Sequence, residues 1–300
     1  MTDAATHSKA SFSRFAPFIA AAAGVGFLAL MDAFMKGAAL ATGAYTATVL
    51  RSLIGAVIIA PFWLLRRSAW PQRDVLKLHV ERGIISAFMA LSFFFALTKM
   101  PLAEAIAISF IAPLIALYLA RVFLGEAIAT RAVFASLLGF AGTIVIVSGR
   151  IGIGSDGGPE MSREFALGLT SLLFSAVLYA YNFIVIRRQS QVAGPVEIAT
   201  FHSGVGGLVL LLFAPFFWTD PALEALASIG AAGALTVAGA MAIAWAYARA
   251  ETQSLVPMEY SGFVWASLFG WLFFNEEVSP PTLIGASLII LGCWIAARKR

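Results

Sequence analysis

The sequence predicts an all-α integral membrane protein with ten transmembrane helices in two inverted five-helix repeats. Three observations support this fold class. Of the 300 residues, 60% are hydrophobic and 12% are charged, and the mean hydropathy is +0.89. Long apolar segments recur along the whole chain, and the second half echoes the first. Soluble domains carry about 25% charged residues, so this chain has too little polar surface for water, and lipid must surround most of it.

Ten apolar segments account for the predicted helices. Segments of about 17–25 residues can cross the roughly 30 Å hydrocarbon core of a bilayer as helices. In chain order, they lie at 15–39, 43–65, 80–99, 102–122, 132–149, 165–186, 196–218, 223–248, 255–274 and 281–297. The first segment runs well past the length of a signal-peptide core, so we expect it to remain as a helix. Pro113 and Pro257 fall inside later segments, where membrane helices tolerate proline.

The basic residues predict the orientation of the chain. With the N-terminus inside, fifteen Lys and Arg residues fall on the inner side and only four on the outer side, with Arg51 inside the second segment. Cytoplasmic loops carry such an excess of basic residues. We therefore expect a multi-pass protein of the cell inner (cytoplasmic) membrane with both termini in the cytoplasm. The single cysteine, Cys293, excludes a disulfide within the chain.

The two halves match when the sequence is shifted by 150 residues. The shift pairs Asp32 with Asn182, Lys99 with Arg249, Phe110 with Tyr260, Glu126 with Glu276, and Gly142 with Gly292. We therefore expect a first five-helix repeat at 1–149, a linker at 150–164 and a second repeat at 165–300. Because five is odd, the second repeat must enter the membrane from the opposite side. Inverted repeats can open a central site to each side in turn, which favours transport by alternating access over a purely structural bundle.

Two motifs carry a resemblance to a known family. They are "SFIAPLIALYLARVFLGEAIA" at 109–129 and "EYSGFVWASLFGWLFFNEEVSPPTLIGASLIILG" at 259–292. With the ten-helix pattern, they resemble the EamA-type branch of the drug/metabolite transporter superfamily over nearly the whole chain. Within that branch the chain is similar to the YddG-type exporters of aromatic and other neutral amino acids, which implies amino-acid export. The second half has Phe263 where the first has Pro113, so we expect any helix break there to be asymmetric.

Two charges inside the apolar segments are the strongest candidates for a transport site. Asp32 lies roughly 10 Å below the outer edge of the first segment and Arg51 roughly 12 Å down the second, at 1.5 Å per residue. Because isolated charges are costly at such depth, we expect them to pair. The pair could clamp the two helices, or could bind the ammonium and carboxylate of a zwitterionic substrate. Asp32 could also couple transport to protons, whereas Lys36 is expected to snorkel outward.

Four further residues are candidates for contacts with substrate. Asn182 and His202 are the repeat partners of the charged pair and lie near the inner side. His202 titrates near neutral pH, so it serves as a proton site or as a hydrogen bonder between helices. Tyr179 and Trp245 could stack on apolar or aromatic substrate groups.

Residues near the helix ends divide into two groups. Glu259, which follows Pro257, and Tyr260 lie close to the inner mouth of the bundle and could line the path. Glu126 and Glu276 precede helix starts, where a carboxylate is favourable, and we interpret both as structural. The prolines at 113 and 257 are likewise interpreted as structural.

The sequence contains no enzyme motif: HExxH, CxxC, the Walker glycine loop and GxSxG are all missing. We therefore expect no catalytic residue, cofactor or metal. The expected partners are a small-molecule substrate and the lipid bilayer, without nucleic acid, and we expect a monomer. Lipophilic cations or drugs are the alternative substrates. An intramembrane enzyme or a receptor is the alternative from another class.

Overall fold

The computed structural model describes residues 3–65, 70–124, 130–151, 162–189, 191–247, 249, 255 and 258–297. Among these residues all regular structure is helical. The helices are α1 (Asp3–Thr42), α2 (Ala44–Leu65), α3 (Arg73–Leu97), α4 (Leu102–Ser109), α5 (Ala112–Leu124), α6 (Thr130–Ile151), α7 (Arg163–Gln189), α8 (Pro195–Leu211), α9 (Ala214–Phe217), α10 (Leu223–Tyr247), α12 (Ser261–Phe274) and α13 (Pro280–Ala297). Most of the expected linker and all of its central part lie outside the described residues, as do Glu126 and Pro257.

Each expected apolar segment is mainly helical where it is described, but the helices differ in length. Six are long and apolar enough to cross a membrane, namely Phe15–Thr42, Ala44–Leu65, Arg73–Leu97, Leu102–Phe123, Arg163–Ile186 and Leu223–Ile243. Four shorter apolar helices occupy the other expected positions, at Ser136–Gly149, Pro195–Leu211, Ser261–Phe274 and Pro280–Gly292. The all-helical, lipid-exposed architecture therefore agrees with the sequence, while ten complete crossings remain a prediction.

The fourth and ninth expected helices are broken at equivalent positions. In the first half, Phe110 and Ile111 form a turn between α4 and α5; in the second, residues 258 and 259 are helical and Tyr260 precedes α12. The rings of Phe110 and Tyr260 pack edge to face, 5.6 Å apart. The expectation of an asymmetric break was wrong, because Pro113 lies in the first turn of α5, where proline fits without breaking the helix.

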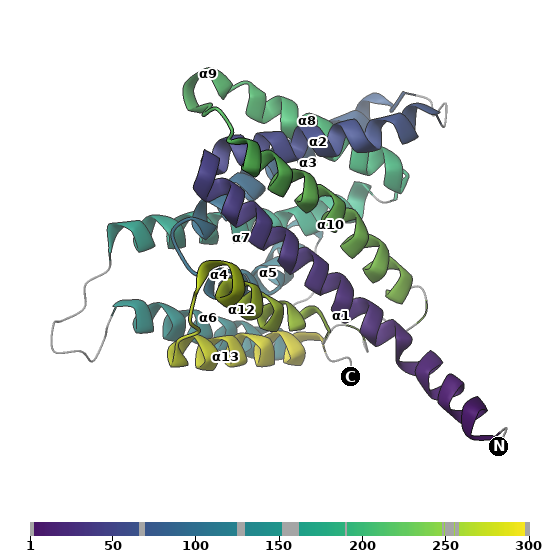
Figure 1. Cartoon of the computed structure of the whole chain (residues 1–300), viewed down its shortest axis with the longest axis vertical. Coiled ribbons are helices and arrows are strands. Elements are labelled where there is room, and N and C mark those ends of the chain that lie inside the picture. Colours follow the sequence, from purple (N-terminus) through teal and green to yellow (C-terminus); the bar gives the residue numbers. More distant parts are fainter. Residues whose placement is uncertain are drawn as a thin grey trace.

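Packing between the helices follows the internal repeat. The longest contacts join α1 with α10, α3 with α7, α2 with α8 and α6 with α13, and α1 lies diagonally beside α10 in Figure 1. Under the 150-residue shift α1 corresponds to α7 and α3 to α10. The first two contacts are therefore equivalent to each other, and the other two join equivalent helices. A pseudo-twofold relation between the halves produces this pattern.

Contacts near the ends of the helices define two ends of the bundle. At one end, Leu102 N–H donates to the Glu276 carboxylate at 2.8 Å, and Thr219 N–H donates to Thr46 Oγ1 at 3.0 Å. At the other end, Gln189 Nε2 lies 2.6 Å from His79 Nδ1. We call the first the closed end, because the main buried core lies there. The closed end is at the left of Figure 1, and both termini are right of its centre.

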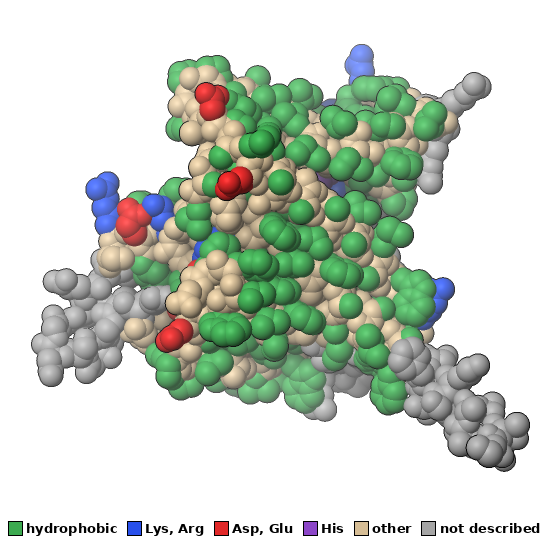
Figure 2. All heavy atoms as spheres, viewed as in Figure 1, with side chains coloured by type: hydrophobic (Ala, Val, Ile, Leu, Met, Phe, Trp, Pro, Cys, Tyr) green, Lys and Arg blue, Asp and Glu red, His purple; other side chains and the backbone are tan. Residues whose placement is uncertain are grey.

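The main buried core is composed of apolar side chains around the closed end. It includes Met35, Leu97, Leu102, Ile108 and Ile289, all less than 2% exposed. The surface is also apolar: Val57, Phe216 and Leu223 are more than 70% exposed, and Figure 2 shows hydrophobic side chains over much of the visible face with few charges. A surface of this kind is expected for a protein in lipid.

Candidate functional site

A cavity of about 1420 Å³ lies where the two repeats meet. Its walls come from α1, α2, α3, α4 and α5 of the first repeat, and from α7, α8, α10 and residues 259–260 of the second. Six of the eight residues proposed from sequence to contact substrate line it: Asp32, Arg51, Tyr179, His202, Glu259 and Tyr260. The cavity is larger than a typical ligand pocket of about 300–1,000 Å³, so it has room for a small metabolite together with water.

Asp32 from α1 and Arg51 from α2 bring opposite charges to the cavity wall. They are close enough to attract each other electrostatically. The four ion pairs found among the described residues do not include them, and no hydrogen bond to either side chain is found there. Instead, the Arg51 guanidinium lies 5.3 Å from the centre of the Phe94 ring. The expected direct ion pair is therefore not formed, and both charges remain exposed to the cavity.

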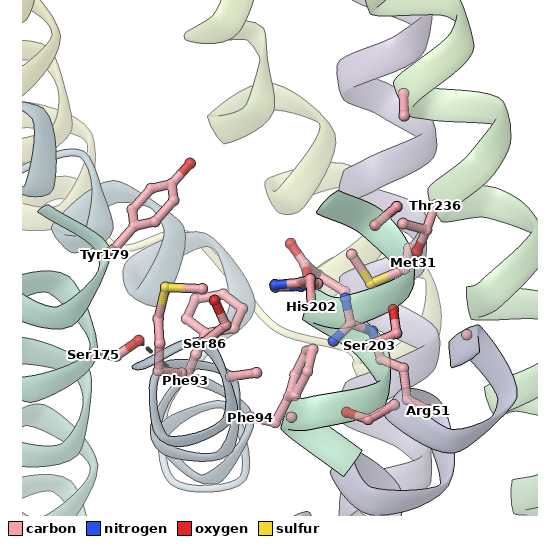
Figure 3. Close-up of a pocket in the computed structure, with 18 of the residues that line it drawn as sticks. Met31, Arg51, Ser86, Phe93, Phe94, Ser175, Tyr179, His202, Ser203 and Thr236 are labelled. Atoms are coloured by element: carbon pink, nitrogen blue, oxygen red, sulfur yellow. Dashed lines mark hydrogen bonds between the residues drawn. The ribbon is translucent and has the colours of Figure 1, made fainter. Parts of the chain in front are cut away.

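Polar groups surround the Arg51 guanidinium. Figure 3 shows Arg51 pointing toward His202 and Ser203 of α8. In the described part of the chain, the buried Nδ1 of His202 has no hydrogen-bond partner. Ser52, one residue after Arg51, donates to the Thr48 carbonyl at 2.9 Å, so its oxygen can still accept a hydrogen bond. This wall can therefore bind a group that accepts hydrogen bonds and carries negative charge, such as a carboxylate.

Aromatic side chains form the other walls of the cavity. Tyr179 and Ser175 lie across the cavity from Arg51, with Phe93 on α3 between them (Figure 3). The Tyr179 ring packs against Phe183, with ring centres 4.8 Å apart. Glu259 and Tyr260 also line the cavity, so its walls combine aromatic rings with a carboxylate.

Trp245 does not belong to this aromatic wall. Its side chain is 40% exposed, and the Arg249 guanidinium lies 4.2 Å from the centre of its ring. Unlike Tyr179, Trp245 is not among the residues that line the cavity, which differs from the interpretation made from the sequence. An aromatic residue on a membrane helix is equally at home facing lipid, so its position along the helix does not reveal its direction.

Asn182 positions another side chain and does not line the cavity. Its Oδ1 accepts from Arg82 Nε at 3.2 Å, and Arg82 Nη1 donates to Gln189 Oε1 at 3.0 Å. Gln189 contacts His79, whose Nε2 lies 2.9 Å from Glu197 Oε1. A buried polar network therefore joins α3, α7 and α8.

The sequence contained a signal for this network that its interpretation missed. His79, Arg82 and Ser86 are spaced i, i+3 and i+7, which places them on one face of α3. The network reaches the cavity through Ser86, which lines the cavity and lies 3.5 Å from Asn182 Oδ1. The charge count that predicts the orientation includes Arg82 among the fifteen basic residues of the inner side, and so gives no sign of its burial.

Lys36 and Glu276 also depart from expectation. Lys36 is 4% exposed and does not snorkel outward. Its ammonium forms an ion pair with Glu276 and donates to the Met100 carbonyl at 2.8 Å. Glu276 was interpreted from sequence as a structural residue before the start of the next helix, but its partners are Lys36 and the first residue of α4, whose N–H it accepts. Pro113 in the first turn of α5 lines the cavity.

The described ranges contain no group of three or more His, Cys, Asp or Glu side chains that could hold a metal ion.

Comparison with known proteins places these features in a family context. The sequence model of the EamA-like transporter family matches residues 16–148 and again residues 166–298. The two matches agree with the two repeats inferred from the 150-residue shift.

Two curated relatives are transporters. The chain is 26% identical over 277 residues to the pseudopaline exporter CntI of Pseudomonas aeruginosa (strain UCBPP-PA14), covering 90% of this chain and 92% of that protein. It is 26% identical over 244 residues to the S-adenosylmethionine uptake transporter of Rickettsia bellii (strain RML369-C), covering 80% and 79%. A solved crystal structure at 22% identity superposes with a TM-score of 0.58 over 92% of this chain and 97% of its own, and so shares the fold.

Proposed function

This chain belongs to the EamA-like transporter family, and from that premise we propose that it exports amino acids or related small metabolites across the inner membrane by alternating access. The observation that carries this proposal is the cavity between the repeats, where Asp32 and Arg51 present opposite charges without pairing directly. Burying a charged side chain inside a membrane protein costs free energy, so the few that are present commonly lie on substrate or ion pathways.

The two charges suit a zwitterionic substrate. Arg51 offers a fork of N–H donors that matches a carboxylate, and His202 and Ser203 stand beside it in Figure 3. Asp32 and Glu259 can stabilise an ammonium group elsewhere in the same cavity. The phenylalanine and tyrosine rings can pack against an apolar or aromatic substrate side chain.

The fold supplies the moving parts for alternating access. The core seals the closed end, whereas the cavity extends to the start of α8 near the opposite end, where Pro195 and Val196 line it. With the N-terminus in the cytoplasm, the closed end faces outward and the cavity takes substrate from the cytoplasm, as an exporter requires. Exchange of conformation between the two inverted five-helix repeats would then open the other side.

The relatives define a range of substrates within this proposal. One exports pseudopaline and the other takes up S-adenosylmethionine. Neither name refers to aromatic amino acids, so the narrower assignment to aromatic amino-acid export rests on the sequence resemblance and belongs to this proposal. S-adenosylmethionine carries an amino acid group, which the charged cavity of this chain could accommodate. A second candidate function is the export of lipophilic cations, favoured by the carboxylate of Asp32 in a largely apolar cavity.

Flux through the purified protein in liposomes tests the proposal. A panel of labelled amino acids is offered with and without a pH gradient, and we expect saturable flux of at least one neutral amino acid. Arg51→Ala should abolish this flux and Arg51→Lys should restore part of it, because the charge returns without the fork. Lys77→Ala is the matched control, since the Lys77 side chain is 78% exposed and outside the cavity.

Three outcomes would contradict the proposal or part of it. Normal flux by folded Arg51→Ala protein would remove Arg51 from the binding site. Flux of cationic dyes without flux of any amino acid would favour the second candidate. Binding of a ligand without flux of any compound would indicate a receptor.

A further inference from the structure

Lys36 and Glu276 form an ion pair at the closed end, away from the cavity. Their side chains are 5% and 18% exposed. One turn before Lys36 on α1, Asp32 faces the cavity, so the same helix connects the cavity with this ion pair. Neither Lys36 nor Glu276 lines the cavity, and the transport site described above does not use the pair.

The ion pair fastens three segments that are distant in sequence. Lys36 belongs to α1, and its ammonium also donates to the Met100 carbonyl in the connection between α3 and α4. Glu276 belongs to the turn after α12, and it accepts the Leu102 N–H at the start of α4. A helix N-terminus has unsatisfied N–H groups that favour a carboxylate, so Glu276 holds α1 and α4 at once.

The turn after α12 is shaped to present this carboxylate. Asn275 has a left-handed conformation with φ of 53° and ends α12. The Glu276 N–H then donates back to the Gly270 carbonyl at 3.1 Å. A Cβ on Gly270 would lie 2.8 Å from Glu276 Oε2, so glycine at this position leaves room for the carboxylate against the helix.

Apolar side chains beneath the ion pair close the cavity toward this end. Met31 and Ile106 line the cavity and also belong to the main core. Met35, one turn beyond Met31, and Leu97 are fully buried in the same core. Opening the cavity to this side requires α1, α4 and α12 to separate, and that movement must break the contacts between Lys36 and Glu276.

We propose that the Lys36–Glu276 ion pair is a latch that keeps the closed end shut while the cavity faces the opposite end. This proposal rests on the transport function proposed above. In the closed state each buried charge is compensated by its partner and by backbone groups. In the open state water solvates both charges. Neutralising one partner removes the counter-charge that the other has in this ion pair, which disfavours the buried arrangement and therefore favours the open one.

Access of water-soluble reagents to the cavity tests the latch without any transport measurement. A single cysteine is placed at Ser52, which lines the cavity, in a Cys293→Ser background, and an impermeant maleimide is added to membrane vesicles of each orientation. In otherwise unchanged protein, labelling should be fast from the opposite end and slow from the closed end. Glu276→Gln should raise labelling from the closed end about tenfold, as expected for the loss of one charge-assisted interaction.

A matched control and a charge exchange sharpen the test. Glu164→Gln removes the exposed partner of Lys99 at the same end, where the side chains are 26% and 64% exposed, and should leave labelling unchanged. The double variant Lys36→Glu with Glu276→Lys restores an ion pair but places the glutamate at the Met100 carbonyl and the lysine at the Leu102 N–H. Labelling from the closed end should therefore return only part of the way toward the original rate.

The outcomes separate the latch from the transport proposal. Unchanged labelling in folded Glu276→Gln protein would overturn the latch, as would an equal rise in the Glu164→Gln control. If Glu276→Gln does not fold, slow labelling from the closed end in folded Lys36→Met protein, which lacks the same ion pair, also overturns it. Absence of amino-acid flux with intact latch behaviour would reject the substrate assignment and leave the latch standing.

Discussion

Replacing Gly142 with alanine should push apart α6 and α13 at the point where they cross. A Cβ at this position would lie 2.4 Å from the Gly285 carbonyl oxygen and 2.7 Å from Ile289 Cγ1. Ordinary van der Waals contact begins at 3.4 Å, so the backbone oxygen would have to retreat by about 1 Å. Because this oxygen belongs to a helix, it cannot rotate away as a side chain could.

The cost of this change follows from comparison with a glycine that has free space. Gly204 in α8 has nothing within 4 Å of an added Cβ. Alanine gains about 1 kcal/mol of helix propensity over glycine at both positions, so this gain cancels in the comparison. The remaining difference is the overpacking at the crossing, which should destabilise the Gly142→Ala variant by about 1–3 kcal/mol relative to Gly204→Ala.

Unfolding in detergent micelles measures the difference. The two variants are purified in parallel, and their free energies of unfolding are compared by denaturant titration. Equal stability of Gly142→Ala and Gly204→Ala would refute the close crossing of α6 and α13.

Two further variants test the buried network and the aromatic wall. Asn182→Ala should lower the free energy of unfolding by about 1–3 kcal/mol, because the buried Arg82 loses a hydrogen-bond acceptor; stability equal to that of the unchanged protein would contradict this role. Tyr179→Ala should raise the KM of amino-acid flux, because Tyr179 lines the cavity, whereas Trp245→Ala should leave flux unchanged, because Trp245 lies outside it. The reverse order of effects in the flux assay would count against the assigned cavity wall.

The fold was largely predictable because lipid makes hydropathy informative. Each crossing needs a long apolar segment, so the segments stand out along the chain, and each expected segment is mainly helical where it is described. The repeat was visible because equivalent residues keep one offset. The symmetric break at Phe110 and Tyr260 was missed because proline was taken as its cause, whereas the equivalent aromatic residues meet at the break.

The sequence predicted where the charged residues of the candidate site lie along their helices, but not which way the aromatic side chains point. Asp32 and Arg51 were found because charges are rare in membrane helices, and their similar depth brings both to the cavity. Aromatic residues carry no such signal, since lipid and protein interior are both apolar. The direction of Trp245 was therefore missed, and the burial of Lys36 depended on Glu276, a partner 240 residues away in sequence.

Cysteine labelling of the two repeats most directly tests the central claim that they cross the membrane in opposite senses. Glu277→Cys, next to the latch but exposed, and Ala127→Cys, its equivalent under the 150-residue shift, are each made in a Cys293→Ser background. An impermeant maleimide should label position 277 only from the outside and position 127 only from the cytoplasm. Labelling of both positions from the same side would contradict the inverted repeat and, with it, transport by exchange of conformation between the halves.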